Sequence, residues 1–389
     1  MPHSSRRNFL LAGLAVPAAA STGTPAAGPS AADTKDRAPV VASGLRYRVL
    51  GKTGLKVTTV GFGCMITSDA SVITRAADIG ITYFDTARGY QNGNNERMVG
   101  AALKGKRQNV VLSSKTHSDT KEGALADLDT SLRELGTDYL DIWYLHAKSK
   151  PAEVTAELLE AQQAARKAGK IRFAGVSTHS GQAELIPELV KNPQIDVFLS
   201  AYNFSMGQTL DPVLAGAHAV GKGVVAMKVM AGGFRNVKPT DKLYGTLKKD
   251  GALLAALRWA LKNPDVDTTI PSMTDVDQLE ENLKAMTGGF TKSDETLLAR
   301  QLEHIAPLYC RMCGACEGSC AKGLPVAEIL RYLTYADGYG QFSLGRERFL
   351  QLPAQVTGTR CGLCPTCTVE CPHGVRVAER LARAQELFA

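Results

Sequence analysis

The sequence has no apolar run long enough to cross a bilayer. Its longest charge-free apolar stretch extends only from Phe9 to Ala20, whereas a membrane-spanning helix needs about 20 residues. It also has no basic block, because the net charge of +7 is spread along the chain, and nucleic-acid binding calls for a clustered positive stripe. With 44% hydrophobic and 21% charged residues, the composition is that of a globular protein. We expect no integral membrane segment and no nucleic-acid partner.

The N-terminus has the organisation of an export signal. Ser5–Leu11 contains Arg6 and Arg7 followed by large apolar residues, which resembles the twin-arginine signal, and Ala18–Ala20 is a small-residue cleavage site. The alternative is a chance arginine pair. We predict a signal peptide over residues 1–20, read by the twin-arginine export machinery, and a periplasmic protein. Residues 21–44 are rich in Ala, Pro, Gly, Ser and Thr, which predicts a disordered linker.

From Leu45 onward, short β-branched runs alternate with amphipathic helical stretches. The predicted strands are Val57–Gly61, Thr82–Asp85, Val110–Ser114, Tyr139–Leu145, Arg172–Val176, Val197–Ala201, Val224–Val229 and Thr268–Ile270. Eight such units over residues 45–290 predict an α/β fold of the (β/α)8 TIM-barrel type. A doubly wound open sheet shares the repeating unit and is the alternative, although no G-x-G-x-x-G follows any predicted strand, so a Rossmann dinucleotide site has no support. Tyr47–Leu55 reads as a hairpin that plugs the bottom of the barrel.

Four polar residues stand at or just after predicted strand ends, where barrel enzymes carry their chemistry. They are Asp85, Tyr90, Lys115 and His146. A tyrosine is a poor acid at neutral pH unless a cation stabilises its phenolate. Lys115 could supply that charge, Asp85 could hold Lys115, and a neutral His146 could polarise a carbonyl. The set predicts carbonyl reduction, or alcohol oxidation in the reverse direction.

These residues resemble those of the aldo-keto reductases. The likeness covers about Leu45–Met286 and rests on stretches that occur in order, among them Arg48–Leu55, Gly61–Met65, Phe84–Ala87, Gly175–Ser177 and Ile270–Ser272. The resemblance implies that Asp85, Tyr90, Lys115 and His146 form the family's catalytic tetrad, with Tyr90 as general acid. It also implies NADP(H) bound across the barrel mouth and a small carbonyl or alcohol substrate.

The resemblance places cofactor contacts along the later strands. Ser177 and Thr178 would hold the nicotinamide amide, Lys228 with Gly232–Gly233 the diphosphate, and a further group the adenosine end: Ser272, Thr274, Gln278, Glu281 and Asn282. Met227 stands where a tyrosine usually stacks on the nicotinamide, and Gln278 where many members have arginine. Substrate specificity is expected in loops such as residues 235–249.

The cysteines are concentrated at the C-terminus. Cys64 stands alone, and the other eight form two C-x2-C-x2-C-x3-C runs, as in cluster-binding ferredoxins. That spacing predicts two [4Fe–4S] clusters, the fourth cysteine of each run serving the other cluster. The expected ligand sets are Cys310, Cys313, Cys316 and Cys371 for one, and Cys361, Cys364, Cys367 and Cys320 for the second. Disulfides and structural zinc are the alternatives.

Residues 291–389 are predicted to form a small α-helical ferredoxin-like domain, with helices over Val326–Tyr335, Arg346–Leu350 and Val375–Phe388. The chain as a whole resembles an exported aldo-keto reductase fused to a ferredoxin tail. A cubane carries one electron and hydride two, so the clusters are expected to be structural or to serve a redox partner protein. The alternative function is an iron–sulfur electron-transfer module whose barrel is a docking scaffold.

Overall fold

The computed structural model describes residues 44–234, 245, 251–362 and 364–389. The predicted signal peptide and all of the predicted linker except Gly44 lie outside the described residues. The loop expected to determine substrate specificity, residues 235–249, also lies outside them except for Gly245. Pro39–Ala389 forms one compact unit, and all further description concerns this unit. Within its described residues, no helix is both long enough and apolar enough to traverse a bilayer.

An antiparallel hairpin precedes the barrel, as predicted. Strands β1 (Tyr47–Val49) and β2 (Lys56–Thr58) pair around the short helix η1 (Gly51–Thr53). The buried Leu50 and Leu55 side chains belong to the hydrophobic core inside the barrel. Gly51 has φ +48, and a Cβ there would lie 2.4 Å from the backbone nitrogen of Gly223 at the start of a barrel strand. The hairpin therefore closes the end of the barrel at which the strands begin.

The barrel is a parallel sheet of eight strands in sequential order, which confirms the predicted strand count. Its strands are β3 (Phe62–Gly63), β4 (Tyr83–Asp85), β5 (Val111–Thr116), β6 (Leu140–Leu145), β7 (Ile171–Thr178), β8 (Val197–Ala201), β9 (Gly223–Met227) and β10 (Thr268–Thr269). Parallel bridges from Val60 to Thr269 and from Gly63 to Ser272 join the first strand to the last. The sheet is therefore closed into a barrel, and the alternative of a doubly wound open sheet is wrong.

One strand prediction is wrong. Val57–Gly61 was expected to be the first barrel strand, but Lys56–Thr58 pairs with the hairpin strand β1, and the barrel strand β3 is only Phe62–Gly63. Val57 and Val60 are buried whichever strand they belong to. Val57 packs into the core inside the barrel, and Val60 packs into the core between the strands and the surrounding helices. Burial alone therefore does not distinguish a plug strand from a barrel strand.

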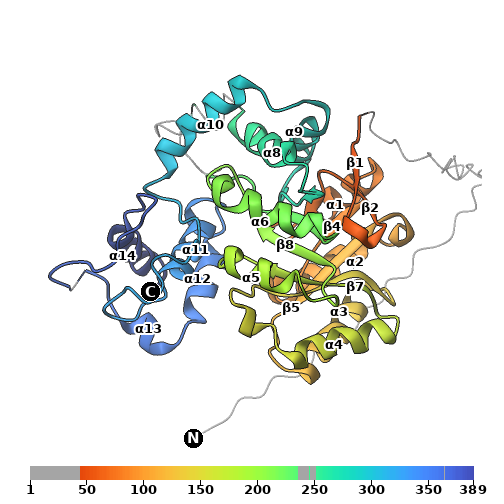
Figure 1. Ribbon diagram of the computed structural model, residues 1–389, viewed down its shortest axis with the longest axis horizontal. Helices are drawn as coiled ribbons and strands as arrows, with labels where there is room; N and C mark the ends of the chain where they lie inside the picture. The colour runs from red at the N-terminus through yellow and green to blue at the C-terminus, as the bar shows by residue number, and fades with distance from the viewer. Residues whose placement is uncertain (1–43, 235–244, 246–250, 363) are drawn as a thin grey trace, which may run out of the picture. The chain divides into compact units, whose positions relative to one another are not determined.

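Helices between the strands cover the outside of the barrel (Figure 1). They are α1 (Ala70–Asp78), α2 (Asn94–Ala102), α3 (Lys121–Leu135), α4 (Ala156–Lys167), α5 (Gln182–Leu189), α6 (Gly207–Ala219), α8 (Ala252–Lys262) and α9 (Val276–Thr287). Side-chain oxygens cap several N-termini: Thr120 accepts the Gly123 N–H at 3.2 Å and Asp275 the Gln278 N–H at 2.8 Å. Such caps satisfy backbone donors that the first helical turn leaves free. The inward helix faces join the outer strand faces in one core.

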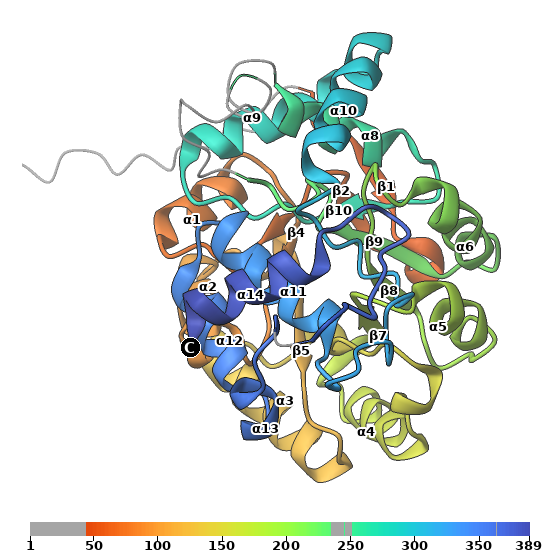
Figure 2. The ribbon, with the colours of Figure 1, turned by 90° about the vertical axis from the view of Figure 1, so that its left-hand side faces the viewer.

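A second core forms in the C-terminal region. Helix α10 (Lys292–Ile305) still belongs to the first core and packs on α8. The helices that follow are α11 (Val326–Asp337), α12 (Phe342–Leu350), α13 (Ala354–Gly358) and α14 (Val377–Phe388). Buried residues of α11, α12 and α14 form the second core. The three predicted C-terminal helices are thus present. Leu333, Phe349, Leu381 and Phe388 are fully or almost fully buried in this core. Figure 2 shows α11, α12 and α14 grouped together.

Helices α11 and α12 lie against the carboxyl ends of the barrel strands. The Arg348 guanidinium in α12 donates to the Gly89 carbonyl in the loop after β4 at 3.0 Å. The Lys228 ammonium, just after β9, lies 5.0 Å from the centre of the Tyr335 ring in α11. The C-terminal helices therefore form part of the barrel mouth.

Candidate active site

The predicted tetrad converges at the carboxyl ends of β4, β5 and β6. Asp85 is the last residue of β4, Lys115 lies one residue before the end of β5, and His146 directly follows β6. Tyr90 begins a short helical turn, Tyr90–Gly93, in the loop after β4. Parallel strands bring their carboxyl ends to one edge, which places side chains far apart in sequence within reach of one another.

Lys115 is the centre of a hydrogen-bonded group. Its ammonium donates to Asp85 Oδ2 at 2.5 Å, to the Thr86 carbonyl at 2.7 Å and to the Tyr90 hydroxyl at 3.3 Å. Asp85 Oδ1 also accepts from the Ser113 hydroxyl at 2.7 Å. Asp85 thus anchors the lysine, and the lysine contacts the phenol oxygen, as the sequence predicted.

Burial controls the protonation of this group. It raises the pKa of Tyr90 well above its usual value, and the negative charge of Asp85 raises it further. Burial also raises the pKa of Asp85 and lowers that of Lys115, while the attraction between the two opposes both shifts. The expected increase in the acidity of Tyr90 is therefore not found: its pKa is raised, and the phenol carries its proton at neutral pH.

His146 belongs to a group of three histidines. Its ring stacks on that of His117, with 3.9 Å between the centroids, lies edge-on to Tyr90 at 5.9 Å, and lies 6.3 Å from His179. Burial and then the neighbouring His117 lower the pKa of His146 well below its usual value. Desolvation in the cavity, with the charges of Arg348 and Arg331, lowers the pKa of His117 to about 4. The imidazoles are neutral near pH 7 and can donate a hydrogen bond without carrying charge.

His117 and His179 were missed by the sequence analysis. Each directly follows a strand, His117 after β5 and His179 after β7. The rule that selected His146 could have found both.

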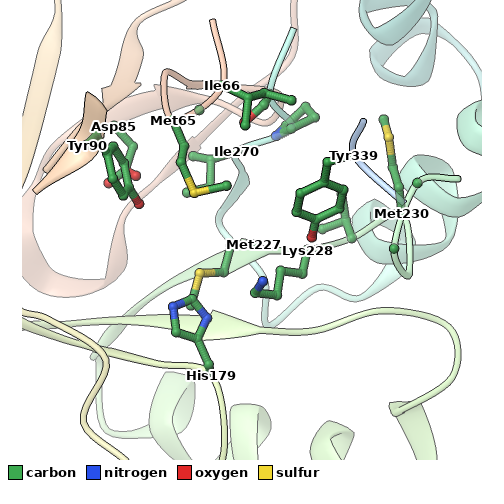
Figure 3. A pocket seen from close by; sticks show the side chains of 16 residues that line it. Met65, Ile66, Asp85, Tyr90, His179, Met227, Lys228, Met230, Ile270 and Tyr339 are labelled. Atoms are coloured by element: carbon green, nitrogen blue, oxygen red, sulfur yellow. The ribbon is translucent and has the colours of Figure 1, made fainter. Parts of the chain in front are cut away.

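Two cavities meet at Tyr90. The methionine-lined cavity (Figure 3) has Asp85 and Tyr90 on one side and Lys228, Met230 and Tyr339 on the other. The arginine-lined cavity extends from Tyr90 and the histidines to Arg331 and Arg348. Both cavities are lined by Met65, Tyr90 and His179. Two reactants could therefore approach the Tyr90 hydroxyl from different sides.

Four of the predicted nucleotide contacts line the methionine-lined cavity: Lys228, Gly232, Gly233 and Ser272. The loop after β9 carries positive φ angles of +57 at Lys228, +93 at Gly232 and +69 at Gly233. Its two glycines are also in close contact with the C-terminal region. A Cβ on Gly338 would lie 2.2 Å from the Gly232 carbonyl oxygen, and one on Gly233 would lie 3.6 Å from the Tyr339 ring. Protein therefore already covers one side of the expected diphosphate loop.

The remaining predicted contacts are not grouped in this cavity. Ser177 and Thr178 are buried at the end of β7; Ser177 accepts the Ala147 N–H at 2.9 Å, and Thr178 donates to the Ser180 carbonyl at 2.8 Å. The others, Thr274, Gln278, Glu281 and Asn282, lie in and just before α9. Gln278 bonds to Thr274, whereas the buried Asn282 amide nitrogen has no partner among the described residues.

The two cysteine runs lie next to each other. Thr368 Oγ1, just after Cys367, donates to the Ser319 carbonyl at 2.7 Å and accepts the Ala321 N–H at 3.2 Å, on either side of Cys320. In the same way, Arg311, which follows Cys310, contacts His373, two residues after Cys371, at 3.2 Å. Cys320, at the end of the first run, therefore lies near Cys367 of the second, and Cys371, at the end of the second run, lies near Cys310 of the first.

The thiols show the same crossed grouping. Burial and the nearby thiols of Cys316, Cys313 and Cys371 together raise the pKa of Cys310 to about 12. The pKa of Cys361 is raised by burial and then by the thiols of Cys367, Cys320 and Cys364. All the cysteines are free, and over the described ranges no three His, Cys, Asp or Glu side chains are already arranged to hold a metal ion. Disulfides, one of the two alternatives to the predicted clusters, are therefore not formed in this structure.

The chain is similar to several known oxidoreductases. It is 28% identical over 284 residues to the uncharacterized oxidoreductase YqkF of Bacillus subtilis, spanning 62% of this chain and 91% of that protein. It is 26% identical over 326 residues to L-glyceraldehyde 3-phosphate reductase of Escherichia coli strain K12, spanning 67% and 93%. The holo structure of the aldo-keto reductase AKR11C1 from Bacillus halodurans superposes with a TM-score of 0.57 at 26% identity, over 66% of this chain and 96% of that one.

The family match covers most of the barrel. Residues 67–300 match the Aldo/keto reductase family, which leaves the cysteine-rich region outside the match. The structure agrees with this match and with the matched relatives. It has an eight-stranded parallel barrel, and a hydrogen-bonded group centred on Lys115 lies at the barrel mouth. The chain belongs to the aldo/keto reductase family and is an aldo-keto reductase-like oxidoreductase.

Proposed function

We propose that the protein interconverts a small carbonyl compound and its alcohol with NADP(H), and that Tyr90 is the general acid. The observation that carries the proposal is the Lys115 contact with the Tyr90 hydroxyl at 3.3 Å, at the point where the two cavities meet. The bound nucleotide would supply or accept hydride. Lys228, Gly232, Gly233 and Ser272 would hold it.

The chain's own residues would handle the proton. Tyr90 carries its proton at neutral pH, since burial raises a pKa that already lies above 7, and it would donate that proton to the oxygen of the substrate. Lys115 would stabilise the phenolate left behind, and Asp85 would hold Lys115 in position. The neutral His146 would orient and polarise the carbonyl, a role that needs a donor without charge.

The first test is the Y90F variant. Butanal reduction with NADPH is expected to fall roughly 100- to 10,000-fold, because one positioned proton donor contributes about that factor. Nucleotide binding, followed by quenching of intrinsic fluorescence, should remain. The matched control is Y47F in the N-terminal hairpin, which should keep full activity. Equal activity of Y90F and wild type would exclude Tyr90 as the acid.

A second candidate function, an electron-transfer module with a non-catalytic barrel, is favoured by the packing of Gly338 and Tyr339 on Gly232 and Gly233. That packing occupies space next to the expected diphosphate site. Anaerobic purification followed by assay of released nucleotide separates the candidates. Stoichiometric NADP(H) supports the reductase. Reversible cluster reduction with no nucleotide binding supports the electron-transfer module.

We also propose that this is a ferredoxin-fused, exported member of the family that carries two [4Fe–4S] clusters. The crossed neighbours of Cys310 and Cys361 support the two ligand sets expected from the spacing. The helical C-terminal core supports a ferredoxin-like domain. About eight irons per chain with matching sulfide are expected after anaerobic purification, and little iron would overturn the assignment.

Export by the twin-arginine machinery to the periplasm is the part of the proposal that rests on the sequence alone. A variant with both R6K and R7K is expected to remain in the cytoplasm, because the receptor reads the arginine pair as an address. The control is R37K, which lies in the predicted linker. Export of the double variant at the wild-type level would exclude this route.

A further inference from the structure

The arginine-lined cavity has walls from two parts of the chain. Tyr90, His117 and His146 line it from the barrel, and Arg331 of α11 and Arg348 of α12 line it from the C-terminal region. Its volume is about 540 Å³, within the range of small-molecule sites. Any substrate that reaches Tyr90 through this cavity therefore meets groups that lie outside the matched family region.

Arg348 has no carboxylate partner among the described residues. Its two terminal nitrogens donate to neutral oxygens, the Gly89 carbonyl at 3.0 Å and the Gln351 side chain at 3.1 Å. These contacts fix the side chain without neutralising its charge. A fixed, uncompensated guanidinium facing a cavity attracts an anion.

Arg331 is only partly satisfied. One terminal nitrogen donates to Glu328 at 2.9 Å and to the Tyr332 hydroxyl at 3.3 Å, whereas the buried Nε has no partner in the described part of the chain. A buried donor without a partner is costly, by about 1–3 kcal/mol. A bound anion would supply the missing acceptor.

Three acidic side chains also line the cavity, and each already has an ion-pair or hydrogen-bond partner. Asp119 pairs with Lys148 at 2.7 Å, and Glu328 with Arg331. Glu153 accepts the Ser149 N–H at 2.6 Å and the Lys150 N–H at 3.3 Å.

The histidines that line the cavity are neutral near pH 7, so they do not change this balance. Tyr335 lines the same cavity beside the two arginines. Burial and Glu328 raise its pKa, but Lys228, Arg331 and Arg348 together lower it below its usual value. At this ring the cationic side chains therefore outweigh Glu328.

We propose that the arginine-lined cavity binds the anionic end of the substrate through Arg331 and Arg348. The preferred substrates are then small carbonyl compounds that carry a carboxylate or a phosphate, with the carbonyl directed to Tyr90 and His146. This inference rests on the proposed reductase function. It gives the C-terminal region a second role, the selection of substrate, in addition to any clusters it carries.

Two matched substrate pairs test the inference. Succinic semialdehyde is compared with butanal, and glyceraldehyde 3-phosphate with glyceraldehyde. Wild type is expected to show a kcat/KM at least tenfold higher for the anion of one or both pairs, since a charge-assisted contact contributes about that factor or more. The pair with the larger ratio identifies carboxylate or phosphate as the anion. Equal values within both pairs would overturn the inference.

Variants of the two arginines locate the effect. R331Q and R348Q should each lower kcat/KM about tenfold or more for the preferred anion. The loss for the neutral partner should be clearly smaller, although R348Q also removes the donation to the Gly89 carbonyl. R348K, which keeps the charge, should recover part of the loss. The control is R346Q, an exposed arginine of the same helix α12 that does not line the cavity. An equal loss for anionic and neutral substrates would contradict the inference.

A binding measurement separates this inference from the proposed function. Succinate and inorganic phosphate are titrated into the full-length protein by calorimetry. Binding that R331Q and R348Q weaken, in a protein that reduces no aldehyde, would support the anion site and reject the reductase. Reduction of butanal that depends on Tyr90, with no binding of either anion, would support the reductase and reject the anion site.

Discussion

At the scale of single residues, burial determines the chemistry that the barrel mouth can perform. Tyr90 and His146 are ordinary titratable groups in water, but desolvation raises the pKa of the phenol and lowers that of the imidazole. Both are therefore neutral over the physiological range. One holds a proton to give away, and the other can polarise an oxygen without repelling Lys115.

The pH dependence of the two reaction directions should differ for this reason. Reduction needs protonated Tyr90, whose pKa is raised, so its rate should stay level between pH 6 and 9. Oxidation needs the phenolate, so its rate should rise about tenfold per pH unit over the same range. Steady-state rates with saturating butanal or butanol would show this. A loss of reduction centred near pH 7 would contradict the assignment of Tyr90.

At the scale of secondary-structure elements, the N-terminal hairpin shows how a backbone contact limits the choice of residue. Gly51 and Gly54 both have positive φ, +48 and +72, but a Cβ would lie 2.4 Å from the Gly223 backbone at Gly51 and would meet nothing within 4 Å at Gly54. The two positions therefore share a conformational preference and differ in available space.

Alanine substitution at these two glycines separates strain from steric overlap. G54A should lower the free energy of unfolding by about 1 kcal/mol, the usual cost of a left-handed non-glycine residue. G51A should cost about 3 kcal/mol or more, because the hairpin must also move away from β9. Urea unfolding followed by tryptophan fluorescence measures both. Equal losses would show that the hairpin moves freely on the barrel.

At the scale of the whole molecule, the C-terminal region is joined to the barrel by specific polar contacts. Arg348 reaches Gly89, next to the proposed acid Tyr90, and the Tyr309 hydroxyl accepts from Asn203 at 3.0 Å. The cysteine runs lie in the same region. If the proposed clusters are present, loss of one is therefore expected to disturb the barrel mouth.

Two cysteine variants test the crossed ligand sets. C371S should lose the cluster of Cys310, and C320S the cluster of Cys361, so that each retains about four irons per chain. C64S, which lies outside both runs, should keep the wild-type iron content. Iron and sulfide assays with electron paramagnetic resonance of the reduced proteins give the count and type. If C371S removed the cluster of its own run, the crossed assignment would be wrong.

The sequence by itself determined the repeating architecture and which polar residues meet at the barrel mouth. Strand–helix periodicity is local, so the strand count and several helix positions could be predicted, and a parallel barrel necessarily gathers its strand ends, which brings Asp85, Tyr90 and Lys115 together. His117 and His179 were available to the same rule. The first strand was misplaced because Val57 is buried in either pairing.

Only the tertiary structure decided what faces Tyr90 from the other side. Arg331, Tyr335 and Arg348 are separated from the tetrad by long stretches of sequence and carry no motif, since their position depends on how α11 and α12 pack against the barrel mouth. The close packing of Gly338 on Gly232 has the same origin. Local patterns encode elements and the order of their ends, whereas contacts between separate cores depend on the shape and charge of surfaces that exist only after folding.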